Sequence, residues 1–417
     1  MLLVSVALTR NIRVLEAANR FLESFMLNTS VSPWPVFDEE EIDAVSQVLR
    51  SGRVNYWTGD ETRQFEQAFA QFADCDHAIA VANGTLALDL ALKAVGVGPG
   101  DDVIVTPRTF IASVSSVVAA GARPVFADVD RRSGNISPDT ISAVLTDRTR
   151  AIIPVHLAGW PCDMPEILKL AEPRSISVIE DCAQAHGGRI NGRSVGSFGA
   201  VGAWSFCQDK IMSTGGEGGM ATCNDQDLRL RMWSYKDHGK DWDAVYKREH
   251  PPGFRWLHES FGSNWRMLEI QAVIGNIQLR RMTQWHNRRA AIAQRYVDAL
   301  KAFPSALRVP LPDAEFTHAW YRFYAYTQPD GLRAGWNRDR IVEEVRRSNI
   351  PLFQGSCSEV YREKAFDGTG LRPKEPLAAA VELGETSLMF VTHPTLTDED
   401  VDKIIETFST VMKKASA

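Results

Sequence analysis

Cysteine is scarce in this sequence, and the spacings typical of metal or redox sites are missing. Six of the 417 residues are cysteines, and none of them form a C-x-x-C pair. A zinc or thiol–disulfide site of that kind is therefore excluded, and no metal site is expected. We interpret the six as free, mostly buried thiols, which fits a reducing cytoplasm.

The sequence also has no excess of positive charge. Lys and Arg number 46 against 52 Asp and Glu, a formal net charge of −6, and no block of basic residues occurs. Nucleic acid or an anionic membrane surface would find no basic face, so a small molecule is the favoured partner. With 44% hydrophobic and 24% charged residues, the composition is that of a globular protein, which excludes disordered and fibrous classes.

We assign residues 1–33 to an N-terminal extension. The opening MLLVSVALTR resembles the apolar part of a signal peptide, but no basic region precedes it and no A-x-A cleavage site follows. We therefore expect a cytoplasmic rather than a secreted protein. Apolar residues at helical spacing from Ile12 to Phe25 predict an amphipathic helix, unless translation begins at Met26.

Short apolar segments alternate with helical ones after this extension. Strands are predicted at 77–82, 102–106, 124–129, 151–155, 175–180, 201–206 and 219–223. Helices are predicted at 85–95, 111–119, 138–145 and 164–171, with another opened by the D-x-x-E pattern at Asp38. This alternation predicts an α/β fold with a mainly parallel, seven-stranded sheet in a large domain, 34–282. A long charged helix, 282–302, and mixed short elements predict a smaller α+β domain, 283–417.

Residues suited to binding an anion and a flat ring follow the first two predicted strands. Ligands of parallel sheets bind beyond the carboxyl ends of the strands, where helix N-termini present free N–H groups. Asn83-Gly84-Thr85 follows the first strand and could cradle a phosphate. Phe110 follows the second and could stack on a ring. Taken alone, these residues also fit a capped turn and a core aromatic.

An acid and an amine follow two further strands. Asp181 ends an apolar strand, where an ionised carboxylate needs a cationic or hydrogen-bonding partner. Lys210 precedes the glycine-rich stretch 215–219, and burial there would lower its pKa and make it nucleophilic. A helix cap and a surface lysine are the plainer alternatives. Anion cradle, ring stacker, acid and amine at one sheet edge are, however, the set of groups that pyridoxal 5′-phosphate (PLP) requires.

Several motifs resemble those of the DegT/DnrJ/StrS-type sugar aminotransferases. The segment SFCQDK at 205–210, followed by TGGEGG at 214–219, is similar to the family's cofactor-lysine signature. Further similar segments are NGTLAL at 83–88, TF at 109–110, DVD at 128–130, VHLAG at 155–159, EDCAQAHG at 180–187 and NWRM at 264–267. The resemblance covers nearly the whole chain from about Trp34, in the family's order.

The resemblance implies the aspartate aminotransferase fold of type I, PLP as cofactor, and Lys210 as the lysine that binds it as a Schiff base. The other implied cofactor contacts are Gly84, Thr85 and Ser205 at the phosphate, Phe110 on the ring, Asp181 at the pyridine nitrogen and Gln184 near the ring hydroxyl. Asn264 would reach the phosphate of a neighbouring subunit's cofactor. A homodimer with shared active sites is thereby implied, and two-fold dimers are the commonest assembly.

By the same resemblance, the reaction would move an amino group from glutamate to a nucleotide-linked 3-keto or 4-keto sugar. Synthesis of a cell-surface polysaccharide such as O-antigen, or of a glycosylated natural product, is the expected pathway. The alternatives within this fold are a PLP-dependent sugar dehydratase and a non-catalytic protein that binds PLP or a sugar nucleotide. Lys210 disfavours both, because the dehydratase has histidine there and a mere binder would need the lysine lost. Gly216–Ala221 formally matches a dinucleotide fingerprint but leads into a strand, which disfavours that reading.

Four further residues are weaker candidates for substrate contacts. Lys236 and His238 belong to the stretch 234–240, which is rich in groups that could meet a diphosphate or a carboxylate. The alternative for this stretch is a solvated loop. His156 and His318 could either contact the sugar or pack in the core.

Overall fold

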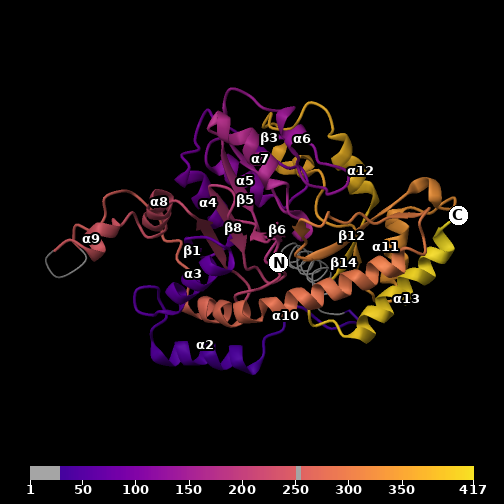
Figure 1. Ribbon diagram of the computed structural model, residues 1–417, viewed down its shortest axis with the longest axis horizontal. Coiled ribbons are helices and arrows are strands. Elements are labelled where there is room, and N and C mark those ends of the chain that lie inside the picture. The colour runs from indigo at the N-terminus through magenta and orange to yellow at the C-terminus, as the bar shows by residue number, and fades with distance from the viewer. Residues whose placement is uncertain (1–28, 250–254) are drawn as a thin grey trace, which may run out of the picture.

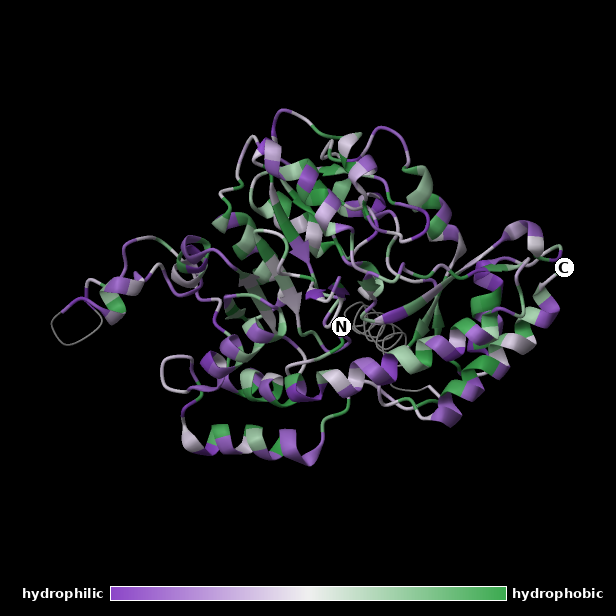
Figure 2. Cartoon of the chain, viewed as in Figure 1, coloured by the Kyte–Doolittle hydropathy of each residue, from purple (hydrophilic) through white to green (hydrophobic). Residues whose placement is uncertain are grey.

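The computed structural model describes residues 29–249 and 255–417. The predicted helix at 12–25, the alternative start at Met26 and most of the assigned extension lie outside these residues. A seven-stranded sheet forms the centre of a large domain, and a four-stranded sheet that of a smaller one (Figure 1). Hydrophobic residues gather on the central strands and on the helix faces turned toward them (Figure 2).

The large sheet has the strand order β1-β9-β8-β5-β4-β2-β3. Its strands are β1 (His77–Val81), β2 (Asp102–Val105), β3 (Arg123–Phe126), β4 (Thr149–Ile153), β5 (Ser177–Asp181), β8 (Val201–Ser205) and β9 (Gly219–Cys223). β9 runs antiparallel to both neighbours, and the other pairings are parallel. Every residue of β2 and β8 is buried, as expected for strands covered on both faces. All seven predicted strands and the α/β class are confirmed.

Helices cover both faces of this sheet. One face packs against α4 (Gly84–Ala94), α5 (Ala112–Ala119) and α8 (Gln226–Lys236). The other packs against α3 (Glu61–Phe72), α6 (Pro138–Ser142) and α7 (Met164–Ala171). The helix predicted from Asp38 is α2 (Glu39–Ser51), and Asp38 and Glu41 form its capping box. The chain beyond α8, which carries α9 (Trp242–Tyr246), projects from the large domain (Figure 1).

The long helix α10 (Glu269–Leu300) joins the two domains. Its first half contacts α2 and α3, while Ile292 and Tyr296 belong to the core of the smaller domain. It begins earlier than the helix predicted at 282–302 and runs unbroken through the predicted domain boundary. That boundary stays a prediction.

The smaller domain is built on a sheet of order β10-β12-β14-β13. Its elements are β10 (Leu307–Arg308), β12 (Arg322–Thr327), α11 (Arg338–Arg346), β13 (Leu352–Phe353), α12 (Ala378–Thr386), β14 (Ser387–Val391) and α13 (Asp398–Ala415). A third, small sheet contains β6 (Arg189–Ile190), β7 (Arg193–Ser194) and β11 (Phe316–Thr317). Short 3₁₀ helices are η1 (Leu157–Gly159), η2 (Glu172–Arg174), η3 (Pro329–Gly331), η4 (Val360–Arg362) and η5 (Lys364–Phe366). Among the described residues, no helix has the length and apolarity needed to cross a membrane.

Candidate active site

A cavity of about 530 Å³ contains several of the predicted site residues. Phe110, Gln184 and Lys210 line it from the large domain, and Tyr321, Arg322 and His393 from the smaller one. Residues 31–34 form another part of its wall. The cavity is thus built from segments far apart in the sequence.

Lys210 faces this cavity from a turn after β8. Its Nζ lies 3.5 Å from Asp209 Oδ1 and 5.2 Å from the centre of the Tyr321 ring. Its carbonyl accepts a hydrogen bond of 2.8 Å from Trp34 Nε1, which holds the turn. The predicted lowering of the Lys210 pKa is wrong. Burial does disfavour its charge, but the interactions with Tyr321 and Asp209 outweigh burial and raise the pKa.

Asp181 is the last residue of β5, and its side chain is buried. Its Oδ2 accepts a hydrogen bond from Ser113 Oγ at 2.8 Å, and its Oδ1 accepts one from the Ala183 amide at 3.1 Å. Burial raises the pKa of Asp181, and these bonds and the charge of Lys210 offset that effect only in part. A cation beside this carboxylate would stabilise its ionised form. A pyridinium nitrogen fits that requirement.

The N-terminus of α4 and the end of β8 meet closely. A Cβ atom at Gly84 would lie 2.5 Å from Ser205 Cβ, so only glycine allows this approach. Asn83 caps the helix by accepting the Leu86 amide at 3.0 Å, and Thr85 is exposed in the first turn. A helix N-terminus flanked by hydroxyl groups suits the phosphate of PLP.

Phe110 and Gln184 complete the set of predicted residues at the cavity. The Phe110 side chain is 69% exposed, so the alternative of a core aromatic is wrong, and its ring is available for stacking. Gln184 Oε1 accepts the Ala158 amide at 2.7 Å, which fixes the direction of this side chain. The chemical groups of PLP are therefore matched by the amine of Lys210, the carboxylate of Asp181, the ring of Phe110 and the N-terminus of α4.

Asn264 lies apart from this cavity. It is exposed, and its backbone pairs with that of Asp237. The contact that the resemblance implies for it involves a neighbouring subunit, so that contact stays a prediction.

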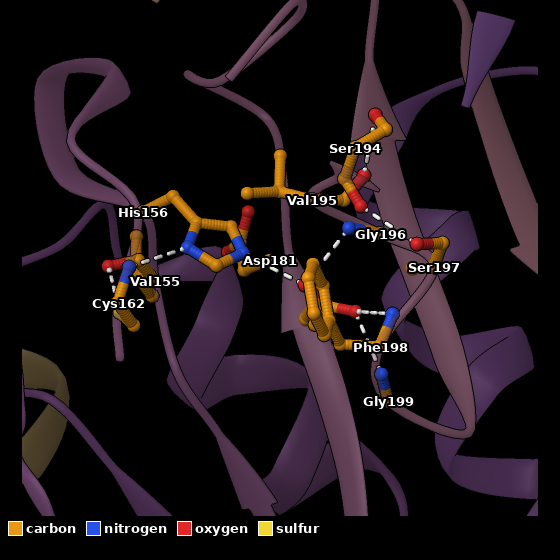
Figure 3. A network of polar contacts seen from close by, with 12 residues as sticks. Val155, His156, Cys162, Asp181, Ser194, Val195, Gly196, Ser197, Phe198 and Gly199 are labelled. Carbon is orange, nitrogen blue, oxygen red and sulfur yellow. Dashed lines mark hydrogen bonds and ion pairs between the residues drawn. The ribbon is translucent and has the colours of Figure 1, made fainter. Parts of the chain in front are cut away.

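His156 and His318 are both engaged within the protein. His156 is completely buried; its Nε2 lies 3.1 Å from Glu180 Oε2, and its Nδ1 accepts the Cys162 amide at 2.9 Å (Figure 3). His318 Nδ1 accepts the Trp320 amide at 2.8 Å, and burial lowers the pKa of His318 to about 3. Its ring lines a separate cavity of about 20 Å³. These contacts favour core packing over sugar contact for both.

Lys236 and His238 have different surroundings. Lys236 is completely buried, with Nζ 3.5 Å from Glu66 Oε1 and 3.6 Å from the centre of the Tyr56 ring. It does not line the large cavity, and a solvated loop is also wrong for this residue, because α8 extends through it. Burial lowers the pKa of Lys236. His238 is exposed and has a positive φ of 63°.

Glu180 organises a buried network next to Asp181. Its carboxylate accepts the amides of Gly196 at 2.8 Å, Phe198 at 2.8 Å and Gly199 at 2.7 Å, besides its contact with His156 (Figure 3). The atoms of His156, Glu180 and Cys182 that could bind a metal lie within 4.8 Å of one another. The histidine and glutamate atoms already form hydrogen bonds, so we interpret this cluster as structural and not as a metal site.

We expect Glu180→Gln to destabilise the protein. The substituted amide would bring an NH₂ group against backbone N–H donors, leaving buried donors unpaired, at a cost of roughly 2–4 kcal/mol in unfolding free energy. Urea unfolding of both proteins measures this cost. Glu166→Gln is the matched control, since Glu166 is an exposed acid paired with Lys169 on α7 and should leave stability close to that of the parent. Equal midpoints for the two variants would contradict a structural role of the Glu180 charge.

Several side chains of the site were missed in the sequence. Ser113 lies one helical turn after Thr109, and that spacing was an available signal for a contact with the strand ends. No sequence pattern pointed to Tyr321 and Arg322. They contact Asp209 but belong to the other domain, 112 or more positions away in the sequence.

Comparison with known proteins gives consistent matches. The sequence model of the DegT/DnrJ/EryC1/StrS aminotransferase family matches residues 35–409. GDP-perosamine synthase of Caulobacter vibrioides is 37% identical over 382 residues, which cover 91% of this chain and 97% of that protein. The solved aminotransferase from Psychrobacter cryohalolentis is 58% identical with a TM-score of 0.91, covering 92% of this chain and 99% of its own. The PLP-form of the putative sugar aminotransferase Spr1654 from Streptococcus pneumoniae is 25% identical with a TM-score of 0.81, covering 92% and 99%.

Proposed function

The chain belongs to the DegT/DnrJ/EryC1/StrS aminotransferase family, and we propose that it transfers the amino group of glutamate to a nucleotide-linked 3-keto or 4-keto sugar. It is a PLP-dependent aminotransferase. The proposal rests on one observation. Lys210 and Phe110 line the same cavity, and Asp181 is buried at the end of a neighbouring strand. The similarity to GDP-perosamine synthase, named for a nucleotide-linked amino sugar, supports this substrate class.

PLP, when bound, supplies an aldehyde for attack by an amine and a ring that withdraws electrons from the reacting carbon. In our proposal, Lys210 Nζ holds the cofactor and moves the proton during transfer. Asp209 and Tyr321 favour the protonated form of this amine, as its raised pKa indicates. Asp181 would hold a proton on the ring nitrogen, and the N-terminus of α4 with Ser205 would bind the phosphate.

We further propose a homodimer in which Asn264 serves the neighbouring subunit's site. Asn264 is exposed and outside its own cavity, which is compatible with that role. The exposed side chains of Trp256 and Phe261 lie on the same segment and would gain from burial at an interface.

Incubation with glutamate and a panel of nucleotide-linked 3-keto and 4-keto sugars tests the substrate proposal. We expect continuous formation of 2-oxoglutarate with at least one keto-sugar, because only an acceptor returns the cofactor to its starting form. Glutamate alone is the control and should yield no more than one equivalent per active site. Turnover of simple keto acids, with every keto-sugar inert, would overturn the proposal.

A further inference from the structure

The cavity that contains Lys210 also contains a buried arginine whose hydrogen-bonding capacity is mostly unused. Arg322 is the first residue of β12 and is 6% exposed. Side chains alternate along a strand, so Phe323 packs into the core of the smaller domain while Arg322 lines the cavity.

The guanidinium of Arg322 makes one hydrogen bond within the described part of the chain. Its Nη1 donates to the Tyr321 carbonyl at 3.2 Å, and its Cζ lies 4.3 Å from the centre of the Tyr321 ring. Its Nη2 is 3.8 Å from Asp209 Oδ2, which is too long for a hydrogen bond. A guanidinium carries five N–H donors in a planar fork, so most of that fork remains for a ligand.

Positive charge exceeds negative charge around this fork. Asp209 lies between Lys210, at 3.5 Å, and Arg322, at 3.8 Å. Its carboxylate also accepts a hydrogen bond from the Tyr321 hydroxyl. The other acid that the described residues contribute to the cavity wall, Glu363, is exposed to solvent. One buried carboxylate therefore faces two cations, and an anionic ligand would neutralise the remaining positive charge.

A second buried arginine adds to this excess. Arg289 of α10 is completely buried, and its Nη1 donates to the Trp320 carbonyl at 3.4 Å. Within residues 29–249 and 255–417, its Nε and Nη2 have no hydrogen-bond partner. Burial lowers the pKa of Arg289 to about 9, and the positive charge of Arg322 contributes to this lowering.

We propose that Arg322 binds the carboxylate of the amino donor, an inference that rests on the proposed function. A guanidinium fork matches a carboxylate in a bidentate pair. Lys210 and Arg322 share Asp209 and Tyr321 as neighbours, so one small molecule can reach both. An amino acid carries its amine and its carboxylate on one carbon, so its amine could reach the cofactor position next to Lys210 Nζ while its carboxylate pairs with Arg322. A carboxylate on the acceptor sugar would offer the same chemistry, and the experiment must separate the two sources.

Arg322→Gln in the holoenzyme tests the proposal, because it removes the charge and keeps a polar side chain. The two half-reactions are followed separately by rapid mixing, with glutamate added to the PLP form and keto-sugar to the aminated form. We expect the glutamate concentration for half-maximal rate to rise roughly 10- to 100-fold, while the acceptor half-reaction stays unchanged. Calorimetric titration with glutarate, a dicarboxylate without an amine, should show a comparable loss of affinity.

Two further variants make the outcome decisive. Arg322→Lys keeps the charge without the fork, and should fall between the parent and Arg322→Gln. Arg308→Gln is the matched control. Like Arg322, Arg308 packs on a tyrosine ring, with Cζ 4.5 Å from the centre of the Tyr326 ring, but it lies outside the cavity wall. It should change neither half-reaction.

Unchanged affinity for both glutamate and glutarate in Arg322→Gln would overturn the proposal. A loss confined to the acceptor half-reaction would also overturn it, and would assign the carboxylate to the sugar. If the parent enzyme aminates no keto-sugar, the proposed function fails, while the glutarate titration still decides the role of Arg322.

Discussion

We expect Lys210→Ala to abolish amino transfer and to leave a protein that still binds PLP. The alanine variant has no amine at the cavity to hold the cofactor covalently or to move the proton. Loss of the proton transfer alone should lower the rate roughly 10²- to 10⁴-fold, and loss of the covalent bond should lower it further. Formation of 2-oxoglutarate measures the rate. The near-visible absorbance of lysine-bound PLP should vanish, whereas in the parent it should persist until borohydride is added.

Two controls accompany this experiment. Lys169→Ala removes an exposed lysine of α7 and should leave both rate and spectrum intact. Mixing Lys210→Ala with Asn264→Ala should restore part of the activity if the dimer shares its sites, because some mixed dimers would then contain one site without either substitution. A Lys210→Ala protein with the parent's rate would refute the assignment of Lys210.

The fold was predictable because its strands are recognisable without their partners. β2 reads DVIV and is buried along its whole length, so a short apolar run between turns was enough to identify it. The same reasoning applies to the proposed cofactor residues. Ligands of a parallel sheet bind where the strands end, so the position of Asp181 after an apolar run already indicated its place.

The positions of the other candidate residues depend on partners that sequence order does not reveal. The buried Lys236 lies against Glu66 and the Tyr56 ring, and the buried His156 lies against the carboxylate of Glu180. Tyr321 and Arg322 reach the cavity only because the smaller domain packs against the large one. A polar residue type in the sequence is therefore compatible with either core or site until its neighbours are known.

The prediction of a lowered pKa for Lys210 failed for a related reason. It counted burial alone, and burial does oppose the charge of this amine. The carboxylate of Asp209, adjacent in sequence, and the ring of Tyr321, from the other domain, act in the opposite direction. The balance of the two effects depends on contacts across the domain interface.

Asp181→Asn is expected to lower the maximal rate roughly 10²- to 10³-fold, as does the loss of other buried electrostatic stabilisers of a transition state. Asparagine has nearly the same shape. Its oxygen can accept the Ala183 amide while its NH₂ group donates to Ser113 Oγ, whose hydroxyl can in turn donate to Thr109 Oγ1. It carries no charge, so it cannot keep a proton on the ring nitrogen, and the ring would withdraw electrons less effectively. Single-turnover rates with saturating glutamate measure the effect on the chemical step.

We expect Asp181→Asn to lower activity without lowering the unfolding free energy. Burial raises the pKa of Asp181 in the folded protein, so folding disfavours the ionised carboxylate, and ionisation above the ordinary carboxyl pKa lowers the unfolding free energy. Without PLP, Asp181→Asn should therefore be at least as stable as the parent in urea at pH 7. Ser113→Ala is the matched control, because it removes a hydrogen bond to Asp181 but leaves its charge, and it should reduce the rate far less. A variant Asp181→Asn that is both slow and unstable would indicate a structural defect instead of the loss of a charge that serves the cofactor.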